Sequence, residues 1–150
     1  MNRAFSSEAE VDDLARRFLD HTLPRAEWTH AAHFAVALWL LRRRPESAAE
    51  REMPRLIRAY NAAVGTANTD SSGYHETITR ASLAAARSVG AAWSDRPLHE
   101  ALEALMATDL GRPNWLLGYW SRERLFSVEA RRGWVEPDLA PLPWRVRISS

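Results

Sequence analysis

Three histidines and one glutamate are the residues of this chain whose types and spacing could do chemistry. Glu27, His30 and His33 follow one another at three-residue intervals, and residues three apart on a helix are neighbours on one face. His75 follows a polar stretch, residues 68–73, at the predicted start of another helix. Imidazole and carboxylate groups placed together can bind a divalent metal or transfer protons.

The first hypothesis is a shared site at one end of a helical bundle. If the helices alternate in direction, the first turns that carry His30 and His75 lie at the same end. With Glu27 beside them, they would form a two-histidine, one-carboxylate metal site, in which His33 is a third ligand or supports the ligands. Without a metal, the same groups would serve as general base and acid. The alternative is that these histidines are hydrogen-bonded core residues.

The loop before His75 has an explanation of its own. Residues 68–72 are of the types that cap helices, so we expect them to cap the helix that begins after them. Glu76 is expected to pair with Arg80 on the surface, because the two lie four residues apart. His75 is then the residue whose place capping does not explain. Near the positive end of the helix dipole its ring should stay neutral, able to bind a metal or accept a proton.

Aromatic and polar side chains near these positions could line the pocket of a small-molecule ligand. The residues that we assign to ligand binding are Trp28, His33, Asn68, Tyr74 and Trp115. For the aromatic members, the alternative is ordinary packing in the core. Trp115 begins an irregular region and is the best placed to close the mouth of such a pocket.

The composition limits the chemistry further. The 150 residues, 46% hydrophobic and 26% charged, are typical of one globular domain spanning 1–150. Without cysteine or lysine, thiolate metal sites and Schiff-base nucleophiles are excluded. A net charge of +1 argues against a nucleic-acid partner. No phosphate-binding glycine motif predicts a nucleotide cofactor. With no apolar run of about 20 residues or signal-like start, we expect no membrane contact and a cytoplasmic location.

Periodicity predicts an all-α fold, a small bundle of about five helices with an irregular, Trp- and Pro-rich C-terminal wrap. Ser7 and Glu10 have the spacing of a capping box and start the first helix. Residues 25–43 are apolar on both sides, which is typical of a central helix. The third helix contains Pro54, which should kink it or mark its regular start. The fourth and fifth cover about 76–90 and 95–110, and the wrap packs through Trp134, Leu139, Leu142 and Trp144.

Three stretches together resemble a family of small bacterial helical proteins to which no activity is assigned. They are "EWTHAAHFAVALWLL", "YNAAVGTANTDSSGYHETIT" and "YWSRERLFSVEARRGWVEPDLAPL", and the most specific pieces are the Trp-Thr-His-x-x-His and Gly-Tyr-His-Glu-Thr motifs. The resemblance covers most of the chain from Glu27 to Leu142. It implies a stand-alone helical domain, and it implies no reaction and no catalytic residues.

Two functions are consistent with these features. The first is a small soluble helical enzyme or ligand-binding protein that uses a His- and Glu-lined pocket, with or without a divalent metal. The second is a non-enzymatic interaction domain, or one that forms a homo-oligomer, through its Trp- and Arg-rich C-terminal segment, since Trp and Arg are favoured at interfaces.

Overall fold

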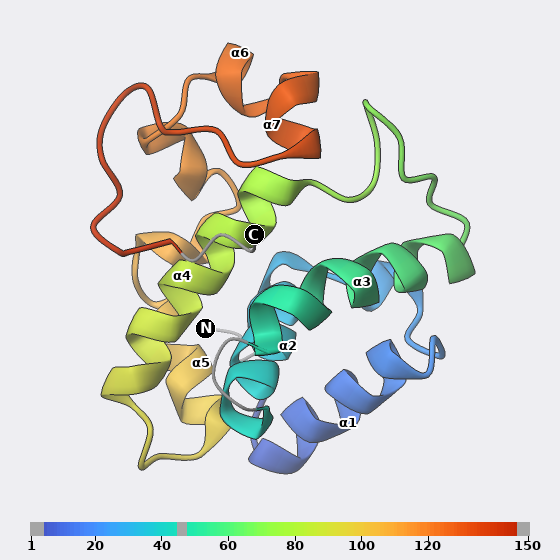
Figure 1. The fold of residues 1–150 in the computed structure, drawn as a ribbon. Helices are drawn as coiled ribbons and strands as arrows, with labels where there is room; N and C mark the ends of the chain where they lie inside the picture. The colour runs from blue at the N-terminus through green and yellow to red at the C-terminus, as the bar shows by residue number, and fades with distance from the viewer. Residues whose placement is uncertain (1–4, 45–47, 147–150) are drawn as a thin grey trace.

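The computed structural model describes residues 5–44 and 48–146, and over these residues the fold is all-α (Figure 1). The longer helices are α1 (Glu8–Leu19), α2 (His30–Arg43), α3 (Ala48–Ala63), α4 (Glu76–Ala92) and α5 (Leu98–Met106). In this part of the chain, extended pairing is limited to a single bridge between Thr69 and Ser72. The predicted small helical bundle is confirmed.

Helix α1 starts where the sequence predicts. The hydroxyl of Ser7 accepts the N–H of Glu10 at 3.2 Å and so caps the helix. The apolar stripe of Val11, Leu14 and Phe18 is buried. Local capping and periodicity are sufficient to specify this element.

Helix α2 is the centre of the bundle, as its uniformly apolar sequence predicts. It packs against α1, α3, α4 and α5, and every residue from Phe34 to Leu40 is buried. A helix covered on all sides has no face left for polar residues. Its polar groups are therefore confined to its two ends.

Helix α3 runs through Pro54 without ending there. Proline has no N–H, so the carbonyl of Glu50, four residues earlier, loses its helical donor. Arg80 of α4 replaces that donor, because its Nη1 donates to the Glu50 carbonyl at 2.7 Å. The gap that proline makes in one helix is thus filled by a side chain from another.

The pair of Glu76 and Arg80 lies inside this contact and not on the surface, so that prediction is wrong. Arg80 Nε donates to Glu76 at 2.7 Å, and the two side chains are 6% and 16% exposed. The Glu50 side chain is buried as well and forms an ion pair with Arg87. The spacing of four residues predicted the pair correctly, but the packing of α3 against α4 buries it.

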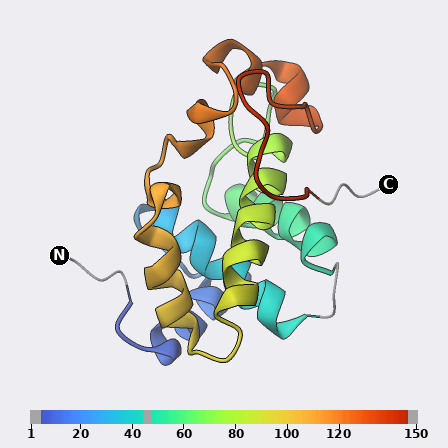
Figure 2. The ribbon, with the colours of Figure 1, turned by 90° about the vertical axis from the view of Figure 1, so that its left-hand side faces the viewer.

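The chain after α5 consists of short turns and helices followed by an extended segment, where the sequence predicts an irregular C-terminal wrap. The turns and helices are η2 (Asp109–Gly111), η3 (Trp115–Gly118), α6 (Arg122–Leu125) and α7 (Val128–Arg132), and the 3-10 turn η1 (Arg25–Glu27) precedes α2. The hydroxyls of Ser121 and Ser127 cap α6 and α7. After α7 the chain returns along α4 as an extended segment (Figures 1 and 2). None of the described helices is long and apolar enough to cross a membrane.

Replacing Arg80 with methionine should lower the free energy of unfolding by about 3–5 kcal/mol, because the change leaves the buried Glu76 carboxylate without its counter-charge and the buried Glu50 carbonyl without a donor. Urea unfolding followed by circular dichroism measures the loss. The matched control is Arg16→Met, which breaks a 3.0 Å ion pair with Asp12 that has the same spacing of four residues in a helix, but in which Arg16 is 70% exposed. Its cost should be about 1 kcal/mol or less. Equal losses in the two variants would contradict the buried role of Arg80.

Candidate functional site

Glu27 does not share a helix with the two histidines that come after it. It ends the 3-10 turn η1, and α2 begins only at His30. Thr29 causes the break, because its extended backbone and its hydroxyl, which accepts the N–H of Ala32 at 3.2 Å, make it an N-cap. The Glu27 carboxylate instead accepts a hydrogen bond from Arg17 at 3.2 Å. The predicted common helix face of Glu27, His30 and His33 is therefore wrong.

His30 joins the start of α2 to the second half of the chain. Its Nε2 lies 2.7 Å from the carbonyl oxygen of Leu110 in η2. A carbonyl oxygen can only accept, so Nε2 carries the proton and donates it. One ring nitrogen of this predicted ligand or base is thus used to hold the fold.

His33 lies one turn further along α2 and belongs to an aromatic stack. Its Nδ1 donates to the carbonyl of Thr29 at 2.8 Å, and its ring lies 3.8 Å from that of Trp28. Burial lowers the pKa of His33 to about 4. The ring is therefore neutral over most of the pH range, as a packed side chain requires.

Trp28, predicted to line a pocket, packs in the same stack. Its ring is parallel to that of Phe18 at 4.4 Å, and Tyr60 completes the cluster at 5.4 Å. The Tyr60 hydroxyl donates to the carbonyl of Leu23 at 2.7 Å and fixes the turn after α1. Of the two alternatives for Trp28, the structure shows core packing.

His75 is itself the N-cap of α4. Its Nδ1 accepts the N–H of Ile78 at 3.1 Å, while its Nε2 donates to the carbonyl of Leu125 at 2.7 Å. Burial lowers the pKa of the ring, and the charge of Arg131 lowers it further. The prediction that residues 68–72 cap this helix is wrong, and with it the view that capping does not explain His75. The expected neutral state agrees with the direction of the pKa shift.

Asn68 organises the loop before His75. Its Oδ1 accepts hydrogen bonds from the N–H of Tyr74 and from Asn61, both at 3.0 Å, and its Nδ2 donates to the carbonyl of Arg58 at 3.1 Å. Gly73 has a φ of +78°, and a Cβ there would lie 2.4 Å from the Ala67 carbonyl oxygen. The loop closes on the Asn68 amide, and only glycine fits at position 73.

Tyr74 is also tied to its neighbours. Its hydroxyl donates to Glu76 at 2.5 Å, and the guanidinium of Arg58 lies 4.2 Å from its ring centre. Burial raises the pKa of the hydroxyl well above its usual range. Tyr74 thus connects the loop to the buried pair of Glu76 and Arg80.

The predicted metal ligands are not assembled into a metal site. Over residues 5–44 and 48–146, no group of three or more histidine, aspartate or glutamate side chains could hold a metal ion. His30 and His75 are instead bonded to two different carbonyls, those of Leu110 and Leu125. Glu27, His30, His33 and His75 therefore do not form the proposed set of ligands.

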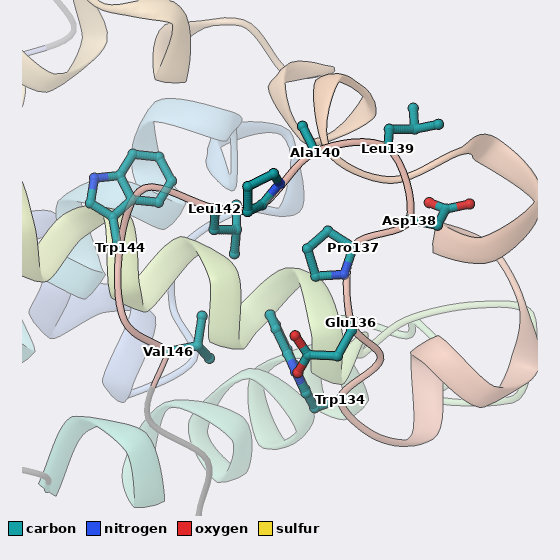
Figure 3. Close-up of a pocket in the computed structure, with 10 residues that line it drawn as sticks. Trp134, Glu136, Pro137, Asp138, Leu139, Ala140, Leu142, Trp144 and Val146 are labelled. Atoms are coloured by element: carbon teal, nitrogen blue, oxygen red, sulfur yellow. The ribbon is translucent and has the colours of Figure 1, made fainter.

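A hollow lies elsewhere, in the extended C-terminal segment. It has a volume of about 510 Å³, and the described residues that line it lie between Trp134 and Val146. Figure 3 shows Trp134, Glu136 and Leu142 directed toward the enclosed space, while Leu139 points outward. Leu139 is 59% exposed, so its predicted packing on the bundle is wrong. We call residues 134–146 the C-terminal loop.

The first part of the C-terminal loop is fixed to α4 and to the turn before α6. Thr77 donates to the carbonyl of Gly133 at 2.8 Å and accepts the N–H of Val135 at 3.2 Å. The indole N–H of the fully buried Trp120 donates to the carbonyl of Val135 at 3.1 Å. These bonds hold the chain at the point where the loop begins.

Its middle part is fixed by the cap of α6. The N–H and the hydroxyl of Ser121 donate to the carboxylate of Asp138 at 2.8 and 2.7 Å. These bonds hold the pKa of Asp138 below its usual range. The N–H of Leu139 donates to the carbonyl of Tyr119 at 2.9 Å. Trp115, the last of the predicted pocket residues, is buried and contacts Trp144 edge to face at 5.7 Å, so it supports the loop from below.

The sequence contains a partial signal for this hollow. Pro137, Pro141 and Pro143 predict an extended chain without helix. They do not predict that the chain closes on itself, because closure depends on partners such as Thr77, which lies more than fifty residues earlier in the chain.

Comparisons with known proteins give no relative for this chain. No protein-family model, no curated protein and no solved structure matches it.

Replacing His75 with alanine should cost about 1–3 kcal/mol of stability, because α4 loses its cap and the Leu125 carbonyl loses its donor. His75→Asn is the matched variant, since asparagine keeps an acceptor for the N–H of Ile78 and should lose less. Urea unfolding measures both. If alanine and asparagine cost the same, the cap is not what His75 contributes.

The buried imidazoles should also make stability depend on pH. The pKa of His33 is lowered from 6.5 to about 4, and that of His75 is lowered too, so the unfolded chain binds more protons below 6.5. Their contribution is complete above about 6.5 and is lost as the pH falls toward about 4. A loss of about 1–3 kcal/mol is expected across this window.

The control is His33→Asn, which keeps a donor for the Thr29 carbonyl but does not titrate. Unfolding free energies of the wild type and of this variant, measured at a series of pH values, should converge as the pH falls. Parallel curves would show that His33 contributes nothing to the pH dependence.

Proposed function

We propose that the protein is a non-enzymatic binding domain whose recognition element is the C-terminal loop. The observation that carries the proposal is the hollow of about 510 Å³ within that loop. Its volume falls in the range of about 300–1,000 Å³ that small-molecule sites occupy. The ligand would be a small molecule, or a single side chain that projects from a larger partner.

The residues around the hollow favour binding over catalysis. They are two tryptophans, prolines, aliphatic side chains and the acidic residues Glu136 and Asp138. Among the described residues, no histidine, serine or tyrosine lines it, and one of its two carboxylates, that of Asp138, is already bonded to Ser121. Aromatic and apolar walls with a few polar groups are typical of a ligand site.

The hydrogen bonds of the histidines support the same choice. Both ring nitrogens of His75 are bonded to backbone groups, and His30 and His33 each use one nitrogen in the same way. A general base needs a nitrogen that can exchange its proton with a substrate. To act as a base, His75 would have to break one of the two bonds that hold the start of α4.

The first half of the C-terminal loop, residues 134–140, is also fixed to the bundle before any ligand arrives. Its backbone is bonded to Thr77, Tyr119 and Trp120, and Asp138 is bonded to Ser121. A loop that is already ordered loses little entropy on binding, which favours affinity. The large apolar side chains of Phe126, Val128 and Leu139 are exposed at this end of the chain as well.

Binding can be tested by NMR on the indole N–H signals, with those of Trp134 and Trp144 assigned from the variants Trp134→Phe and Trp144→Phe. Small cationic, neutral and anionic probes are added separately at millimolar concentration. We expect at least one class to shift the signals of Trp134 and Trp144. Trp39 is the internal control, because its indole N–H is bonded to Asp12 at 2.9 Å in another part of the bundle. The proposal fails if no class of probe shifts the two loop signals, or if Trp39 shifts as much.

A further inference from the structure

The electric charge at the hollow is one-sided. Among the residues that the structure describes, Glu136 and Asp138 line it, and no arginine does. Asp138 is bonded to Ser121 and points outward in Figure 3, so Glu136 is the charge that faces the space. Arg124 is nearby, but its guanidinium is bonded to the backbone carbonyl of Glu136 at 2.6 Å and does not line the hollow.

One carboxylate oxygen of Glu136 is available to accept a hydrogen bond from a ligand. Its Oε2 accepts the indole N–H of Trp134 at 2.6 Å, while its Oε1 makes no hydrogen bond to the described residues. The bond orients the carboxylate along the wall, beside the Trp134 ring (Figure 3). A donor or a positive charge in the hollow would therefore find an acceptor already in place.

Two indole rings in the wall are fixed by other rings. Trp134 packs edge to face on Trp120 at 5.6 Å, and Trp144 packs in the same way on Trp115 at 5.7 Å. The faces of indole rings carry negative potential and attract cations more strongly than other aromatic side chains do. The ring contacts fix the positions of the two indoles in the wall.

Other classes of ligand fit less well. An anion would meet the Glu136 carboxylate, and no arginine in the described part of the wall would balance it. A purely apolar ligand would cover that carboxylate and remove its water without replacing the lost hydrogen bonds, which costs free energy. A cation satisfies the carboxylate and the two indole rings together.

We propose that the C-terminal loop binds a compact organic cation, an ammonium or guanidinium group, between Trp134 and Trp144, with Glu136 as its counter-charge. This inference rests on the proposed binding function and names the class of ligand. The same chemistry could come from a free small molecule or from an arginine or lysine side chain of a peptide.

The charge of the ligand can be tested with a pair of probes that have one shape. Choline and its neutral carbon analogue, dimethylbutanol, differ in the charged nitrogen and little else. Titration calorimetry should give choline about 2- to 30-fold tighter binding, the range that one cation–π contact spans. Equal affinity for the two probes, or tighter binding of acetate, would overturn the inference. A second arm compares methylguanidine with a blocked Gly-Arg-Gly peptide, and tighter binding of the peptide identifies a peptide as the source.

Three variants separate the charge and the ring from the rest of the loop. Glu136→Gln keeps the shape but removes the charge, and Trp144→Phe and Trp144→Leu weaken and then remove the aromatic face. Choline affinity should fall about 2- to 30-fold in Glu136→Gln and Trp144→Leu, with Trp144→Phe between Trp144→Leu and the wild type. The control Asp109→Asn removes a carboxylate that is 89% exposed in η2 and should change nothing. Thermal melting of each variant shows whether the fold is retained.

The outcomes distinguish the inference from the proposed function. If a neutral or anionic probe shifts the Trp134 and Trp144 signals and choline does not, the C-terminal loop is a binding site and the cation inference is wrong. If choline binds equally well to the wild type, Glu136→Gln and Trp144→Leu, it binds elsewhere, and the inference is again wrong. If no probe of any charge binds, both fail.

Discussion

The arrangement of the second half of the chain depends on the two hydrogen bonds that the imidazole of His75 makes. One ring nitrogen begins α4 by accepting the N–H of Ile78, and the other holds the carbonyl of Leu125 at the end of α6. The bond to Ile78 requires a neutral ring, since a protonated Nδ1 would face a donor with a donor. Few other side chains could make both bonds. Serine or asparagine would cap the helix, but neither is long enough to donate a second hydrogen bond to the Leu125 carbonyl as well.

The position of α6 then determines the course of the chain after it. Ser121, the cap of α6, holds Asp138, while Thr77, in the first turn of α4, holds the chain on both sides of Trp134. The C-terminal loop is therefore built on two helix starts that His75 brings into register. The aromatic residues predicted to surround a catalytic pocket take part in this support, as the contact between Trp115 and Trp144 shows. The hydrogen bonds of the capping histidine thus help to position the C-terminal loop.

The sequence predicted the features whose causes are local. Ser7 begins α1, and the uniformly apolar run from Phe34 to Leu40 lies at the centre, because capping and periodicity act over a few residues. The predictions from the sequence were wrong where a feature depends on residues far away in the chain. The helical spacing of Glu27 and His30 concealed the break at Thr29, and nothing near His75 in the chain indicates a carbonyl fifty residues later. The prolines of the C-terminal segment predicted an extended chain, but the hollow needs partners from α4 and from the turn before α6.

Pro54 and Arg80 illustrate what such distant causes mean for how this chain can vary. A proline at position 54 is tolerated because a guanidinium from α4 serves the carbonyl that the proline leaves without a donor. With any other residue at position 54, the backbone N–H would serve that carbonyl itself, and the guanidinium at position 80 would keep only its bond to Glu76. The two positions should therefore vary together among related sequences. Proline at 54 should occur only where position 80 is arginine, whereas arginine at 80 can also occur with other residues at 54.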